Sequence, residues 1–146
     1  MSYYDEVAIG LYKEDYDYLL EEAKKLTENK LKDVLYFVTK QCEVFNYQAN
    51  DKEYVILHWD CVNGWHYNAC AQYVISFLHG DVGKYADDKE KYVDCPKYVF
   101  LRLGEDSNDT EEDYNTGNNE TGEDDYVLNS LFFLERKINL DQVIKE

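Results

Sequence analysis

The sequence predicts a single α+β domain, with an antiparallel or mixed sheet of about four to five strands and two to three helices. Three observations support this. The 146 residues suit one hydrophobic core. At 45% hydrophobic and 16% aromatic residues, the chain is too apolar to be disordered despite a formal net charge of −16. Extended and helical apolar patterns also follow one another in an order that resembles the split βαβ, or ferredoxin-like, plan.

The first two elements are a strand and a helix. In residues 4–12, Val7, Ile9 and Leu11 alternate with the residues between them, which predicts a strand with one buried face. From about residue 14 to residue 28 the apolar period becomes helical, with acids near the start and lysines near the end. The apolar face of this helix consists of Tyr16, Leu19, Leu20, Ala23 and Leu26.

A second helix and a hairpin come next. Residues 29–40 keep the helical spacing, although the run VLYFV alone would also suit a strand. Two extended runs at 42–48 and 54–61 enclose Asn50 and Asp51, which are typical of a hairpin turn.

The last third of the chain is predicted to contain a helix, two strands and an acidic excursion. Residues 69–78 have helical spacing and end before Gly80, and residues 97–104 alternate as a strand after Pro96. Residues 126–140 contain a further extended apolar run. Residues 105–125 are rich in Asp and Glu, lack Lys and Arg, and predict a mobile surface excursion between two strands.

The charge indicates which partners the protein has. With 31 acids against 15 basic residues, its negative field opposes binding to phosphate backbones and to anionic lipids. No segment resembles a signal peptide, a transit peptide or a spanning helix, so we expect a cytoplasmic protein. In that compartment free thiols are expected for Cys42, Cys61, Cys70 and Cys95.

The predicted partner is therefore a basic protein surface. Three acids of the first helix share one face, and neighbours at i,i+3 or i,i+4 stand roughly 5–6 Å apart, close to phosphate spacing. The excursion supplies further negative charge, and the tyrosines supply interface anchors. The candidate partner-binding residues are Glu14, Asp17, Glu21, Glu105, Asp106, Asp109, Glu111, Glu112, Asp113, Glu123, Asp124 and Asp125. The alternative is that the acids serve solubility alone.

Two segments contain possible metal ligands, and neither predicts a metal site. The excursion offers hard oxygens suited to calcium, but counting from Asp106 the EF-hand template needs Gly at position 111 and Glu at position 117, where the chain has Glu111 and Gly117. The candidate oxygen ligands are Asp106, Asn108, Asp109, Glu111, Glu112 and Asp113. The zinc candidates in HWDCVNGWHYNAC are His58, Asp60, Cys61, His66 and Cys70. Their spacing matches no zinc pattern, and in a strand His58 and Asp60 would share one face while Trp59 and Cys61 share the other.

The sequence does not favour an enzymatic function, and it predicts no cofactor. A cysteine activated by His66 and oriented by Asp60 is conceivable, but no catalytic signature surrounds any cysteine. The sequence contains no P-loop, dinucleotide-binding, HExxH or GxSxG motif.

The runs VILHWDCVNGW, SFLHG, YVFLRLGED and LERKINL, within residues 54–138, loosely resemble small acidic proteins of phages and mobile elements. In size and charge the chain is also similar to anti-restriction and anti-CRISPR proteins, several of which are DNA mimics. This resemblance implies a phage-type inhibitor of a host defence or nucleic-acid-binding protein, active in the host cytoplasm. A non-inhibitory interaction or assembly module is the alternative, and a small cysteine- or metal-dependent enzyme is a third.

Overall fold

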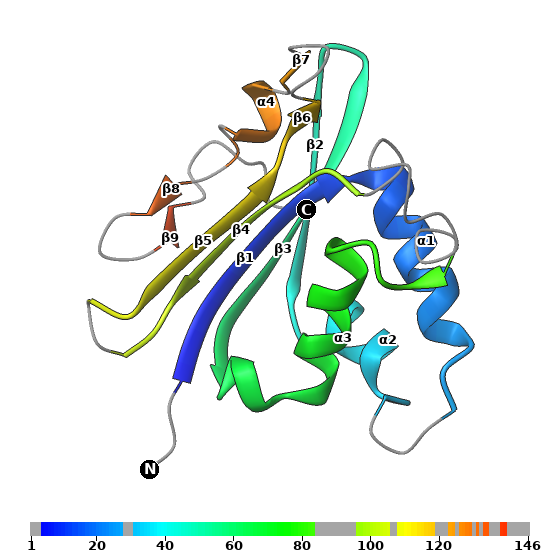
Figure 1. Ribbon diagram of the computed structural model, residues 1–146, viewed down its shortest axis with the longest axis vertical. Helices are drawn as coiled ribbons and strands as arrows, with labels where there is room; N and C mark the ends of the chain where they lie inside the picture. The colour runs from blue at the N-terminus through cyan, green and yellow to red at the C-terminus, as the bar shows by residue number, and fades with distance from the viewer. Residues whose placement is uncertain are drawn as a thin grey trace.

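The computed structural model describes most of the chain, in several stretches (Figure 1). These are residues 4–27, 31–83, 96–105, 108–118, 123–124, 126–129, 131, 133–134 and 138–139. Its main elements are β1 (Tyr4–Tyr12), α1 (Lys13–Lys24), α2 (Val34–Thr39), β2 (Glu43–Ala49), β3 (Lys52–Asn63), η1 (Trp65–Tyr67), α3 (Ala69–Leu78), β4 (Tyr98–Leu103) and β5 (Thr110–Asn115). Short elements follow: β6 (Gly117–Asn118), β7 (Glu123–Asp124), α4 (Tyr126–Asn129), β8 (Phe133–Leu134) and β9 (Ile138–Asn139).

The fold centres on a five-stranded antiparallel sheet with the order β2-β3-β1-β4-β5. Helices α1, α2 and α3 cover one face, and α4 lies on the other side with the β8–β9 pair (Figure 1). The order of the first four strands is that of the split βαβ plan, in which each helical connection joins two strands separated by a third. The structure therefore confirms the predicted α+β class, with β5 added beside β4.

The central strands are buried on both faces, so their side chains form two cores. On the face covered by α1–α3, which we call the helix face, the core includes Ile9, Leu57 and Trp59. On the opposite face, which we call the open face, it includes Ala8 and Ile56 together with residues near the C-terminus. Val7 to Leu11 are all buried, because β1 has a strand on each side and a core on each face.

The helices are tied to the sheet by apolar packing and by buried hydrogen bonds. Helix α1 buries Tyr16, Leu19 and Ala23, as its spacing predicts. The Tyr16 hydroxyl donates to the Val38 carbonyl at 2.8 Å, and the Trp59 indole donates to the Phe37 carbonyl at 3.0 Å. These bonds hold α2, which begins only at Val34 because a turn precedes it, against α1 and β3.

Local signals for the hairpin and for α3 are confirmed. Asn50 and Asp51 have φ angles of 53° and 64°, which a two-residue primed turn requires and which Asn and Asp tolerate. Helix α3 spans the predicted residues. Its cap is Asn68, whose side chain accepts from the Ala71 N–H, and Gly80 follows the helix with a φ of 79°.

Two predictions for the C-terminal third are wrong. The acidic segment was predicted to be an excursion without regular structure, but Thr110–Asn115 forms β5, paired with β4 in a defined register. The run at 126–140 was predicted to be one extended strand, but its described residues form α4 and the short strands β8 and β9. Leu128 and Leu131 from this run are buried in the open-face core. Pairing with β4 thus outweighed the low strand propensity of the acids in β5.

Among the described residues, no helix is both long enough and apolar enough to cross a membrane.

Candidate functional site

Three carboxylate side chains on the open face converge on one imidazole. His58 of β3 lies directly opposite Ala8 of β1 on one side and Glu43 of β2 on the other. Glu6 stands two residues before Ala8, and Asp60 two residues after His58, so strand alternation places both on the same face. We call Glu6, Glu43, His58 and Asp60 the His58 cluster.

A β-bulge shapes this part of the sheet. Val7 pairs with Trp59, but Asp5 pairs with Val62, so β3 carries one extra residue where Glu6 is the opposing residue. As a result Val62 joins Trp59 in the helix-face core, and Cys61 is exposed. The prediction that His58 and Asp60 share a face is confirmed, whereas the pairing of Cys61 with Trp59 on the other face is wrong because of the bulge. Bulges frequently re-aim side chains beside functional sites.

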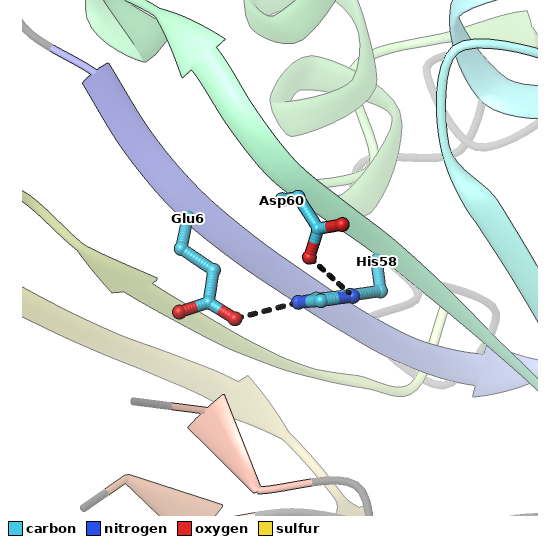
Figure 2. A group of neighbouring side chains, drawn as sticks. All are labelled: Glu6, His58 and Asp60. Carbon is cyan, nitrogen blue, oxygen red and sulfur yellow. Dashed lines mark hydrogen bonds and ion pairs between the residues drawn. The ribbon is translucent and has the colours of Figure 1, made fainter. Parts of the chain in front are cut away.

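The imidazole of His58 lies between carboxylates on both sides (Figure 2). Its Nε2 is 2.7 Å from Glu6 Oε2, a charge-assisted hydrogen bond. Its Nδ1 is 3.5 Å from Asp60 Oδ1 and 3.6 Å from Glu43 Oε1, and it has no hydrogen-bond partner. The His58 side chain is only 7% exposed, whereas that of Asp60 is 76% exposed. Nδ1 is thus a buried polar atom directed toward two carboxylates beyond hydrogen-bonding distance.

The arrangement is suited to holding positive charge. An ionised carboxylate only accepts, so Nε2 donates its N–H to Glu6, and the lone pair of a neutral imidazole is then on Nδ1. Among the described residues, Glu6, His58 and Asp60 each bring one donor atom to within 4.8 Å of the others. A metal cation at Nδ1 would balance the carboxylates around this ring.

A second acidic cluster lies on the helix face around Arg102 of β4, whose side chain is 6% exposed. Its guanidinium donates to Asp5 at 2.8 Å, to Asp109 at 2.6 and 3.2 Å, and to Glu111 at 2.6 Å. We call Asp5, Arg102, Asp109 and Glu111 the Arg102 network. The hydrogen bond from Arg102 lowers the pKa of Asp109, and the same bond, with those to Glu111 and Asp5, raises the pKa of Arg102 despite its burial.

The acids of β5 that face the helices are also engaged internally. Glu111 contacts His66 of η1 as well as Arg102. Asp113 accepts hydrogen bonds from the Tyr98 hydroxyl at 2.6 Å and from His79 at 3.0 Å. Burial opposes ionisation of Asp113, but these two hydrogen bonds outweigh it and lower its pKa. Burial and the hydrogen bond to Asp113 raise the pKa of Tyr98. Strand β5 is therefore held to the sheet by ionic contacts as well as by its ladder.

The acids of α1 lie on one exposed face, as predicted. Glu14, Asp17 and Glu21 are all exposed, and Asp17 forms an ion pair of 3.2 Å with Lys13. Glu14 and Asp17 also line an open cleft of about 610 Å³ to which Lys13, Lys52 and Lys97 contribute. The start of this helix therefore presents charges of both signs.

The other candidate partner-binding residues differ in their surroundings. Glu105 accepts from the backbone N–H of Tyr4 at 3.1 Å, and Glu112 is exposed. Glu123 and Asp124 form β7, which pairs with β6. Asp106 and Asp125 lie outside the described residues. Of the calcium candidates, Asp109 and Glu111 are bound by Arg102, whose guanidinium supplies the positive charge that a cation would bring.

The sequence candidates for zinc and for a nucleophile are separated by the fold. His58 and Asp60 come together, but His66 contacts Glu111 in the Arg102 network instead. Burial raises the pKa of Cys42 to about 12 and also raises the pKa of Cys70, which disfavours the reactive thiolate. Cys42, Cys61 and Cys70 are free thiols, and Cys95 lies outside the described residues.

Sequence reasoning missed Glu6 and Glu43 in the His58 cluster and Asp5 in the Arg102 network. One signal was available, because Glu6 and Arg102 are charged residues inside otherwise apolar strands. Charged residues are rarely buried without a partner. Which partner each one meets depends on strand register, however, and a single sequence does not reveal register.

Comparisons with known protein families, with curated proteins and with solved structures found no match.

Proposed function

We propose that this protein is an inhibitor of the phage type, which binds the basic groove of a host defence or other nucleic-acid-binding protein. The exposed face of α1 is the central contact. The observation that carries the proposal is the exposure of Glu14, Asp17 and Glu21 on one side of a helix whose other side is anchored in the core. A fixed row of carboxylates resembles a row of phosphates in a way that a flexible acidic segment does not.

The anchoring of α1 supports a fixed geometry. Tyr16, Leu19 and Ala23 are buried, and the Tyr16 hydroxyl is bonded to the Val38 carbonyl. The acids at positions 14, 17 and 21 are separated by one helical turn each, which gives a rise of roughly 4.5–6 Å per step. The net charge of −16 adds a field that attracts a basic partner over a longer range.

The acids in and beside β5 contribute less to the proposed acidic contact surface than their number indicates. Asp109, Glu111 and Asp113 are already bound by Arg102, by histidines or by Tyr98. Glu112, on the open face of β5, is exposed and remains the best candidate from this strand. The proposed contact therefore rests mainly on α1.

Charge reversal on α1 tests the proposal. The double variant Asp17→Lys with Glu21→Lys is compared with Asp33→Lys and Asp81→Lys, which reverses two exposed acids outside α1 and its cleft and gives the same net charge. Each protein is used to capture partners from host lysate, followed by elution in a salt gradient. We expect the α1 variant to weaken capture by about tenfold or more and the control to weaken it much less. Equal weakening by both, or capture unaffected by salt, would contradict mimicry by α1.

A second candidate is a non-inhibitory interaction module that uses exposed tyrosines. Tyr67 is 92% exposed, and Tyr36 and Tyr114 are also exposed, although large aromatic side chains are normally buried. Tyrosines of this kind anchor protein interfaces. Under this reading Tyr67→Ser abolishes capture, and the charge reversals on α1 leave it intact.

A further inference from the structure

We propose that the His58 cluster is a binding site for one divalent transition-metal cation of the zinc class. Nδ1 of His58 and Oδ1 of Asp60 are the preformed ligands, Oε1 of Glu43 completes the set by a shift of its side chain, and Glu6 orients the imidazole from the other side. This site goes beyond the proposed inhibitor function and does not depend on it.

The hydrogen bond between Glu6 and His58 prepares the ring for a metal. Metal-binding histidines almost always donate their second N–H to a carboxylate or a carbonyl, which selects the tautomer and increases the basicity of the ligating nitrogen. Here Glu6 Oε2 accepts from Nε2 at 2.7 Å. The lone pair is thereby directed from Nδ1 toward Asp60 and Glu43 (Figure 2, in which Glu6 and Asp60 lie on opposite sides of the ring).

The distances around Nδ1 agree with a shared cation. Metal bonds of about 2.0–2.2 Å at tetrahedral angles place two ligand atoms roughly 3.3–3.6 Å from each other. Nδ1 is 3.5 Å from Asp60 Oδ1 and 3.6 Å from Glu43 Oε1. The same distances are too long for hydrogen bonds. Each carboxylate oxygen therefore already stands at the distance from Nδ1 that two ligands of one metal require.

Burial of Nδ1 is the second, independent observation. His58 has a side chain that is 7% exposed, and its Nδ1 makes no hydrogen bond. A buried polar atom without a partner is costly, and such atoms in native proteins call for a missing water, ion or function. Asp60 is 76% exposed, so the carboxylate side of the cluster borders solvent.

The ligand types select the class of cation. One imidazole nitrogen with two carboxylate oxygens suits zinc and neighbouring first-row metals, whereas calcium prefers six to eight oxygens. Zinc is the most suitable probe because it adopts the tetrahedral geometry that these separations match.

Zinc binding to the full-length protein, stripped of metal with a chelator, is the direct test. We expect calorimetry to show one zinc per chain. Asp60→Asn changes an exposed ligand and should weaken affinity by at least about tenfold, and Glu6→Gln by about 10- to 100-fold. His58→Gln should abolish binding. The matched control is His66→Gln, because His66 also contacts a carboxylate, Glu111 of the Arg102 network. This variant should bind zinc as the wild type does.

Nitrogen NMR of the histidines separates the site from adventitious binding. A shift of the His58 Nδ1 resonance on addition of zinc, with His79 unaffected, supports the assignment. Three results would overturn it. These are a folded wild-type protein that binds no zinc at micromolar concentrations, an Asp60→Asn variant with unchanged affinity, or an Nδ1 resonance that does not shift on addition of zinc.

Discussion

The Arg102 network and the His58 cluster are both groups of carboxylates around one buried basic residue, but they differ in how far the charges are paired. On the helix face, all three nitrogens of the Arg102 guanidinium donate hydrogen bonds of 2.6–3.2 Å. On the open face, the imidazole makes one bond of 2.7 Å to Glu6, and its other nitrogen stands 3.5–3.6 Å from two carboxylates. The first arrangement is complete within the protein, whereas the second leaves one imidazole nitrogen without a hydrogen bond.

This difference separates a structural role from a binding role for acids of similar appearance in the sequence. Arg102 connects Asp5 on β1 to Asp109 and Glu111 around β5, and Asp5 also accepts from the Trp65 N–H at 2.8 Å. The network thus joins β1, β4, β5 and η1. The sheet ladder already holds the strands of both clusters together, but only the Arg102 network also reaches η1, outside the sheet. Loss of the first should therefore unfold the protein more readily than loss of the second.

The largest effect is expected for Arg102→Ala. Removing Arg102 leaves the buried carboxylate of Asp5 without an opposite charge, and the loss of one partner of a buried ion pair typically costs about 3–5 kcal/mol. Urea unfolding monitored by tryptophan fluorescence would measure the loss. Arg102→Lys keeps the charge but not the forked geometry, so it should be intermediate. A loss below about 1 kcal/mol for the alanine variant would show that the network is not structural.

Zinc should have the next largest effect on stability. A ligand present at 100 times its dissociation constant stabilises the native state by about 2.7 kcal/mol. The free energy of unfolding of the wild type should rise by this amount in zinc and fall again with a chelator. Asp60→Asn should lose the gain but match the wild type within about 0.5 kcal/mol in chelator, since Asp60 is exposed. Equal stabilisation of the wild type and of Asp60→Asn by zinc would show that the His58 cluster is not the zinc site.

The smallest expected effect is loosening of β5 in acid, because Asp109 and Asp113 are half exposed. Both have a pKa lowered from the ordinary value of 3.8. Their contribution to the stability of the folded protein is therefore complete above pH 3.8 and is lost as the pH falls through the lower pKa of the folded state. Hydrogen exchange, corrected for the intrinsic rate, should show the β5 amides opening more at pH 3 than at pH 6. The amides of β1 at its centre serve as the control, and equal changes in both strands would indicate global unfolding instead.

The sequence alone determined the α+β class and the order of the elements from β1 to β4. Alternation in β1 and β4, helical spacing in α1 and α3, and the turn at Asn50 and Asp51 are local signals, because each depends on residues a few positions apart. For the same reason the sequence correctly placed Glu14, Asp17 and Glu21 on one exposed helix face.

Only the tertiary structure decided which acids are paired. His58 meets Glu6 across 52 positions of sequence, and Arg102 meets Asp5 across 97. Such contacts depend on strand register, and a slip of one residue would move every side chain to the other face. The bulge opposite Glu6 and the pairing of β5 with β4 set that register here. One set of acids consequently surrounds an arginine and another surrounds the Nδ1 of His58.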